Sequence, residues 1–407
     1  MTQPLPASPD WENLRKQAKA LRKSFQANDP EAVRRVAAFH PRPPLATAFQ
    51  LSDAQLTLAR ELGFPSWPKL KQHVLTATAE QIALFKQAVE DGDAVSLDAL
   101  LMRHPALKTV VNEPYFGFDA PAVVSQSHNR ALVDVLLRHG ADINARSRWW
   151  AGGFGILDGA DEETAAALMA RGARLDIHAA AGLGMREGVE DFLRADPKLV
   201  HARGGDGKTP LHFAKTPEIA ALLLEAGAEL ESRDIDHGST PAQYAAGERP
   251  DVCRFLLERG AQSDIFMLCA LGELAQVGAL IQADPDLLHS RTSLGPHNPQ
   301  PAPGEHIYIY TLGGDATPLM VAANLGSLAL AEALLAEGAN VNEHEGNATA
   351  LHLAAWAGHA DMVRFLLEHG ADPTREDRTY HSTPAGWAEH NGQTGALAVL
   401  REATGQV

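Results

Sequence analysis

A small set of titratable side chains in this sequence has the residue types needed for acid–base chemistry. Asp158 lies in the glycine-rich stretch RWWAGGFGILDGAD (148–161), and Asp236 and His237 are adjacent in RDIDHGS. A carboxylate beside an imidazole can pass protons when a pocket removes both groups from water. The candidate catalytic set comprises Asp158, His178, Asp236, His237 and Tyr308.

No recognised motif assigns this set to a reaction. The chain has no G-x-S-x-G nucleophile turn, no G-x-x-x-x-G-K-S phosphate loop and no H-E-x-x-H metal helix. The glycines at 152, 153 and 155 would let a ligand approach the backbone, but they follow no predicted strand and lack G-x-G-x-x-G spacing. An enzyme that binds a small molecule is therefore the alternative hypothesis, with the segment 292–315 as a lid.

Histidine and cysteine spacing predicts neither a metal site nor a cofactor. The eighteen histidines are spread along the chain, and we find no pair at a helical i, i+4 interval that would place two ligands on one pocket wall. Cys253 and Cys269 both stand among apolar residues in helical patterns, so we expect them to be core residues.

Composition limits the partners and the location. The chain has 407 residues and a formal net charge of −16, which would repel the phosphates of a nucleic acid. No run of eighteen apolar residues predicts a membrane span, and the N-terminal residues do not resemble a secretion signal, so we expect a cytoplasmic protein. Residues 1–73 hold eleven Lys and Arg against six Asp and Glu, so a basic head precedes an acidic body.

The acidic body contains a repeated pattern that must position any site. Segments that open with Thr-Pro or Thr-Ala recur, and the threonines can cap helices whose first residue is the proline. A glycine that favours the left-handed conformation closes each unit. The clearest of these openings are GKTPLHFA (207–214), GSTPAQYAA (238–246), ATPLMVAANLG (316–326), ATALHLAA (348–355) and STPAGWAEHNG (382–392).

The stretch 346–378 resembles an ankyrin repeat almost position by position, with the period of about 33 residues of that family. The resemblance implies an all-α solenoid of about ten helix pairs joined by β-hairpin fingers. A single unit of this kind cannot bury its own apolar face, so neighbouring units must stack. His212 and His352 stand at the family's TPLH position, which implies that they tie adjacent loops together.

The chain divides into a predicted cap, 1–80, and a repeat array, 81–407. The helical segment 11–75 resembles the head that precedes ankyrin repeats in some bacterial proteins, and we expect helix caps at Asp29 and Ser52. Three variant helix pairs lack the Thr-Pro opening. They lie at 82–111, 177–203 and 265–291. The insertion 292–315 is predicted to form an enlarged β-hairpin finger with a strand at HIYIYTL, and FGILDGA is predicted to begin a helix.

The favoured function is recognition of a protein or peptide through an aromatic, acidic concave groove. Ankyrin arrays present fingertips and first helices on one side, and the resemblance places many of this chain's rings there. Tyr and Trp are enriched in binding hot spots. The predicted binding residues are Trp149, Trp150, Phe213, Tyr244, Tyr308, Tyr310, Trp356 and Trp387. A small-molecule ligand stays open, as does the oligomeric state.

Overall fold

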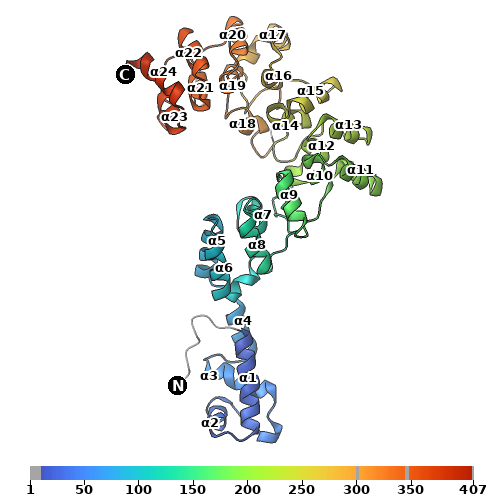
Figure 1. The fold of residues 1–407 in the computed structure, drawn as a ribbon, viewed down its shortest axis with the longest axis vertical. Coiled ribbons are helices and arrows are strands. Elements are labelled where there is room, and N and C mark those ends of the chain that lie inside the picture. The colour runs from blue at the N-terminus through green and yellow to red at the C-terminus, as the bar shows by residue number, and fades with distance from the viewer. Residues whose placement is uncertain (1–10, 299–301, 344–347, 406–407) are drawn as a thin grey trace. The chain divides into compact units, whose positions relative to one another are not determined.

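The computed structural model describes residues 11–298, 302–343 and 348–405, and these are arranged as helices and loops (Figure 1). The chain separates into two compact units. Unit 1 comprises Met1–Arg148 with Gly155–Ala173, and unit 2 comprises Trp149–Phe154 with Arg174–Val407. Within the described residues there is no strand, only isolated bridges such as Phe116 with Ala120. None of the described helices combines the length and apolar character needed to cross a membrane.

Unit 1 begins with four helices around two small apolar cores. Asp29 caps the second helix through Glu31 and Ala32, as predicted. The prediction of Ser52 as a cap is wrong by two residues, because Gln50 is the cap and Asp53 accepts its backbone N–H at 2.7 Å. These helices are α1 (Trp11–Gln26), α2 (Pro30–Phe39), α3 (Leu51–Glu61) and α4 (Trp67–Leu75).

The rest of unit 1 contains two helix pairs and a single helix. They are α5 (Ala79–Glu90) with α6 (Ala94–Arg103), α7 (Ala122–Ser125) with α8 (Arg130–Arg138), and α9 (Glu162–Met169). The helix predicted at FGILDGA does not form. Asp158 instead accepts the backbone N–H of Gly155 at 2.7 Å and closes a turn, and Gly159 has a φ of +76° that no α-helix contains.

Unit 2 contains seven helix pairs and one extra helix. Figure 1 shows the pairs following one another along an arc, with the first helix of each pair on its inner side. The pairs are α10 (Ile177–Leu183) and α11 (Arg186–Ala195), α12 (Pro210–Phe213) and α13 (Pro217–Glu225), α14 (Pro241–Glu248) and α15 (Pro250–Glu258), α16 (Ile265–Leu271) and α17 (Leu274–Ala283), α19 (Pro318–Leu325) and α20 (Leu328–Ala336), α21 (Ala350–Ala357) and α22 (Ala360–Glu368), and α23 (Pro384–His390) and α24 (Thr394–Thr404).

One continuous apolar core runs through unit 2. Leucines of the second helices, such as Leu256 and Leu366, are fully buried against alanines of the first helices. Small residues such as Ala354 and Ala355 let neighbouring first helices approach closely, and each pair thereby covers the apolar face of the next. The stacked all-α repeat architecture predicted from the sequence is confirmed.

The segment HIYIYTL is helical, so the predicted strand and hairpin finger are wrong. It forms α18 (Ile307–Thr311), which His306 caps by accepting the backbone N–H of Tyr308 at 3.3 Å. Ile307 and Tyr308 are buried while Tyr310 is exposed. The alternating sequence therefore belongs to a short helix that packs into the core through its first two residues, Ile307 and Tyr308.

Buried histidines join consecutive repeats, as predicted. Nδ1 of His212 accepts the backbone N–H of Thr209 at 3.1 Å, so its Nε2–H donates to the carbonyl oxygen of Ser239 at 3.1 Å. His352 bridges Thr349 and Ser382 in the same way. Burial lowers the pKa of His212 to about 3, because the apolar surroundings disfavour the charged ring.

This burial predicts a pH dependence of stability. A histidine with a pKa of about 3 when folded and about 6.5 when unfolded stabilises the fold above pH 6.5, and that stabilisation falls as the pH drops toward 3. His212→Gln removes the titrating group but keeps a donor, as Gln243 does at the same position of the next repeat. Between pH 7 and pH 5, urea unfolding should show wild type losing about 2 kcal/mol more than this variant. Equal losses would contradict the assignment.

Candidate functional site

An aromatic cavity of about 840 Å³ opens on the inner side of unit 2. We define it by Tyr310, Trp356, Tyr380, Trp387 and His390. Tyr310 comes from α18, Trp356 from α21, and Trp387 and His390 from α23, while Tyr380 comes from the finger 377–383 that precedes α23. Three of the predicted binding rings, Tyr310, Trp356 and Trp387, therefore meet at one cavity.

The rings of the aromatic cavity pack in two geometries. Trp356 and Trp387 meet edge to face with centroids 5.9 Å apart, and His390 stacks on Trp356 at 6.0 Å. Both are favourable arrangements for aromatic pairs. The ring of Trp387 also contacts His352, the residue that ties α21 to the finger 377–383, at 5.3 Å. Trp387, in the wall of the cavity, is therefore held against the histidine that links two repeats.

A buried carboxylate holds the finger beside the cavity. Asp377 accepts backbone N–H groups from Thr379, Tyr380 and Ser382, and the indole N–H of Trp387 at 2.9 Å. Burial alone would raise the pKa of Asp377, but these hydrogen bonds outweigh it and lower the pKa. The finger is therefore held in one conformation by a charged acceptor.

The cavity leaves large rings in contact with water. Tyr380 is 74% exposed, Tyr310 63% and Trp356 40%. Covering such apolar area yields roughly 25 cal/mol per Å². Three rings on rigid supports provide a surface that a partner can cover at little cost in side-chain entropy.

A second group of charged side chains lies where the loop 204–207 meets the finger 234–239. We call Asp206, Lys208, Asp236 and His237 the Asp206 cluster. Nζ of Lys208 lies 3.3 Å from Oδ2 of Asp206, and Nε2 of His237 lies 3.8 Å from that oxygen and 4.0 Å from Oδ2 of Asp236. Lys208 also faces aromatic rings, with 4.8 Å to the centroid of Phe213.

The two tryptophans that precede the glycine-rich turn lie in different environments. Trp149 is partly buried and its indole N–H donates to Oδ2 of Asp236 at 3.2 Å, whereas Trp150 is 53% exposed. Gly152 donates to the carbonyl oxygen of Trp149 and has a φ of +142°. A Cβ there would lie 2.1 Å from the carbonyl oxygen of Gly204, so the glycine is what allows the segment 149–154 to dock.

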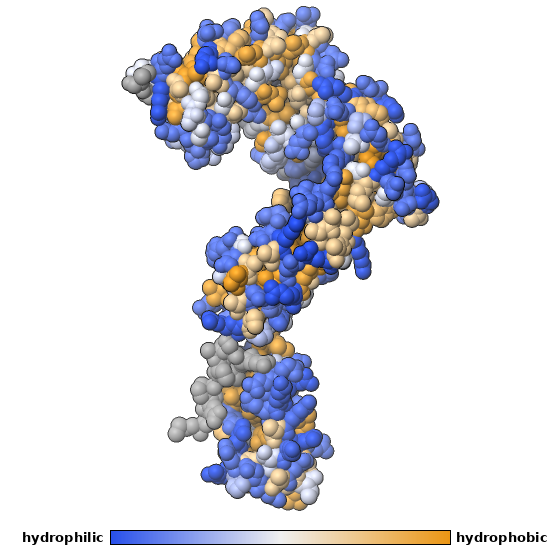
Figure 2. Space-filling view, in the orientation of Figure 1, coloured by the Kyte–Doolittle hydropathy of each residue, from blue (hydrophilic) through white to orange (hydrophobic). Residues whose placement is uncertain are grey.

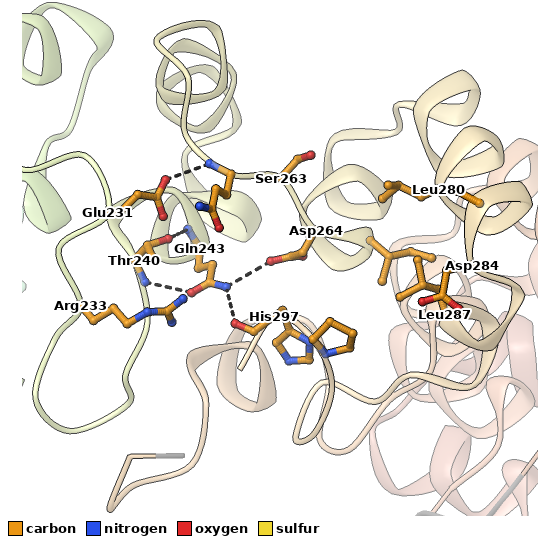
Figure 3. Close-up of a pocket in the computed structure, with 14 residues that line it drawn as sticks. Glu231, Arg233, Thr240, Gln243, Ser263, Asp264, Leu280, Asp284, Leu287 and His297 are labelled. Atoms are coloured by element: carbon orange, nitrogen blue, oxygen red, sulfur yellow. Dashed lines mark hydrogen bonds between the residues drawn. The ribbon is translucent and has the colours of Figure 1, made fainter. Parts of the chain in front are cut away.

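The insertion buries a polar network beside a smaller cavity of about 330 Å³ (Figure 3). Gln243 donates to Oδ2 of Asp264 and to the carbonyl oxygen of His297, both at 3.1 Å. The hydroxyl of Tyr308 donates to the same Asp264 oxygen at 2.8 Å. Tyr308 is fully buried, so its predicted exposure in the groove is wrong, because Asp264 satisfies the hydroxyl inside the core.

The remaining predicted residues lie in several environments. Tyr244 is also buried rather than exposed, since its hydroxyl donates to Asp234 at 3.1 Å. His178 is buried, with Nε2 3.0 Å from the carbonyl oxygen of Ala202 and its ring 5.4 Å from that of the partly buried Phe213. Asp158 belongs to unit 1, where it closes the turn described above.

Sequence reasoning missed four residues that the structure places at these sites: Tyr380, His390, Asp206 and Lys208. Tyr380 and Asp206 stand in loops without a recognisable motif, whereas Lys208 lies inside the opening GKTPLHFA and His390 inside STPAGWAEHNG. The sequence did contain one pattern from which the two fingers could have been predicted: Asp234 and Asp377 each stand six residues before a capping threonine. Each accepts the backbone N–H of the serine five residues later.

Figure 2 shows hydrophilic residues interspersed with hydrophobic ones over the face in view. The exposed rings of the aromatic cavity are those of Tyr310, Trp356 and Tyr380. They gather at one cavity rather than over a broad apolar face.

Comparison with known proteins identifies the repeats. A family model described as "Ankyrin repeats (3 copies)" matches residues 177–267 and 302–377. Residues of this chain are 41% identical over 73 residues to ankyrin repeat and SOCS box protein 6 of Homo sapiens, covering 17% of each chain. They are 30% identical over 177 residues to the B-cell lymphoma 3 protein homolog of Mus musculus, covering 40% of this chain and 36% of that one.

Other matches are longer or structural. Ankyrin repeat and KH domain-containing protein mask-1 of Caenorhabditis elegans is 29% identical over 206 residues, which is 45% of this chain and 7% of that protein. The crystal structure of the human ASB11 ankyrin repeat domain matches 56% of this chain and 98% of its own, at 21% identity and a TM-score of 0.37. The chain spans well under half the length of these curated relatives.

Gly152→Ala should undock the segment 149–154. Gly227→Ala is the matched control, because Gly227 also has a positive φ but no heavy atom lies within 4 Å of the position that a Cβ would take there. Hydrogen exchange followed by mass spectrometry should show 149–154 exchanging about tenfold faster in Gly152→Ala and unchanged in the control. Unchanged exchange in both variants would contradict the docking role of Gly152.

Proposed function

We propose that this chain, an ankyrin-repeat protein, binds a cationic peptide segment of a partner protein in the aromatic cavity of unit 2. Ankyrin repeats generally mediate protein–protein interactions, and the aromatic cavity supports a particular place for the contact. The single observation that carries the proposal is the convergence of the exposed Tyr310, Trp356 and Tyr380 on one cavity with rigid supports.

The charge of unit 2 supports a basic partner. Unit 2 holds 16 Lys and Arg against 32 Asp and Glu, while unit 1 holds 19 of each, so the whole formal charge of −16 belongs to unit 2. Such a field attracts cationic segments and speeds their association. Tyr310, which lines the cavity, donates its hydroxyl hydrogen to the exposed carboxylate of Glu305 at 3.3 Å.

The rings provide the short-range part of the recognition. Indole and phenol faces attract the ammonium of Lys and the guanidinium of Arg by cation–π interaction, most strongly for Trp. Trp356 keeps 40% of its surface exposed although it packs edge to face with Trp387 and stacks with His390. Tyr310 and Tyr380 are more exposed still. A peptide that carries Lys or Arg beside an apolar residue fits this combination of rings and acidic surroundings.

The proposal is tested by selection from a phage-displayed library of random peptides about twelve residues long, each about the length of an extended segment that spans several fingers. We expect the peptides enriched on wild type to be rich in Arg and Lys. Trp356→Ala and Tyr380→Ala should weaken the binding of a selected synthetic peptide at least about tenfold, as loss of a hot-spot residue does.

Trp150→Ala is the matched control, because Trp150 is also an exposed indole of unit 2 but does not line the aromatic cavity. Its peptide affinity, measured by fluorescence anisotropy, should equal that of wild type. Raising the salt from about 50 mM to about 500 mM should weaken binding to wild type by screening. Enrichment of acidic peptides, or equal affinity in Trp356→Ala, would overturn the proposal.

A further inference from the structure

Outside the aromatic cavity, the Asp206 cluster contains three potential metal ligands. One ligand atom from each of Asp206, Asp236 and His237 lies within 4.8 Å of the other two. Among the described residues this is the grouping of His, Cys, Asp and Glu that meets such a spacing. Asp206 stands some thirty residues before the other two in the sequence, which is why spacing along the chain predicted no metal site.

One carboxylate oxygen of the Asp206 cluster is buried without a hydrogen-bond partner among the described residues. Asp206 is 7% exposed, and its Oδ1 is buried without a hydrogen-bond partner within the described part of the chain. Its Oδ2 faces Lys208 and His237. A buried carboxylate oxygen without a donor carries a large desolvation cost, and a cation removes that cost.

The orientation of His237 suits a metal ligand. Nδ1 of its ring lies 2.7 Å from the carbonyl oxygen of Glu305, which can only accept, so Nδ1 carries a hydrogen. This leaves Nε2 facing the carboxylates of Asp206 and Asp236 at 3.8 and 4.0 Å, both longer than a hydrogen bond. Histidine ligands commonly donate their other N–H to a backbone carbonyl in this way.

The loops that carry these ligands are fixed to one another. The backbone N–H groups of Ile235 and Asp236 donate to the carbonyl oxygen of Asp206 at 2.9 and 3.2 Å. Trp149 donates to the carboxylate of Asp236, and Gly304 donates to its carbonyl oxygen at 2.8 Å. The ligands are therefore preorganised by hydrogen bonds outside the cluster.

We propose that Asp206, Asp236 and His237 bind a divalent transition-metal ion, with Zn²⁺ preferred. Two carboxylate oxygens and one imidazole nitrogen form a ligand set that suits Zn²⁺, with water as a fourth ligand. Tetrahedral Zn²⁺ with bonds of about 2.0–2.2 Å needs ligand atoms about 3.3–3.5 Å apart. Nε2 of His237 must therefore approach each of the two carboxylate oxygens by about half an ångström. The ion would join the loop 204–207 to the finger 234–239.

Lys208 provides a further test of the site, because its ammonium contacts one of the proposed ligands, Asp206. Its ammonium lies 3.3 Å from Asp206 and supplies one positive charge beside two carboxylates. A bound metal ion must compete with this ammonium. Lys208→Met keeps an unbranched side chain against Phe213 and removes the competitor, so Zn²⁺ should bind at least about threefold more tightly to this variant. An unchanged Zn²⁺ affinity would contradict an ion placed beside Oδ2 of Asp206.

The full chain, stripped with a chelator and dialysed, is titrated with Zn²⁺ by calorimetry and with Co²⁺ by visible absorption. We expect one tight site per chain, with Asp206→Asn and His237→Gln each weakening it at least tenfold. Asn tolerates the positive φ of residue 206, and circular dichroism checks that each variant is folded.

His289→Gln is the matched control, because His289 contacts a single carboxylate, that of Glu343 at 2.9 Å. It should bind Zn²⁺ as wild type does and keep the Co²⁺ absorption band. Wild-type binding that survives both Asp206→Asn and His237→Gln would overturn the site. Failure of the site would leave the aromatic cavity untouched, since Trp356→Ala and Tyr380→Ala test that separately.

Discussion

One recurring hydrogen bond supports the inner side of unit 2. A polar side chain in the first turn of a first helix reaches the backbone carbonyl of a later loop, from His178 to Ala202, His212 to Ser239, Gln243 to His297 and His352 to Ser382. The donor side chain of each tie is buried, so breaking the tie would leave a buried polar group unsatisfied. The fingers are therefore held by the first helices, and whatever the fingers carry is placed by these ties.

The insertion shows how the array accommodates extra chain without losing that constraint. Where His212 and His352 bond to the next finger, Gln243 instead reaches the carbonyl oxygen of His297 inside the insertion. Tyr308 then fills the core and Asp264 satisfies its hydroxyl. The same packing turns Tyr310 outward, so an element that differs from the regular repeat supplies one wall of the aromatic cavity.

The repeat frame could be predicted from the sequence because its signals are local. Thr240 with Pro241 begins a helix, and Gly260 ends the unit with a φ of +97°, each for reasons contained within a few residues. The prediction failed where distant contacts decide. Tyr308 is buried, and its hydroxyl donates to Asp264, 44 residues away; the strand-like HIYIYTL forms a helix that packs through this ring. Asp206 likewise meets Asp236 and His237 only because two loops that are distant in the sequence contact each other.

We propose that the inner side of unit 2 around α18, α21 and α23 binds the peptide. Hydrogen exchange of the full chain, with and without a saturating basic peptide, measures this directly because binding protects the backbone that it covers. We expect slower exchange in α18 and in the finger 377–383, with no change in α1–α4. Protection confined to the helices of unit 1 would contradict it.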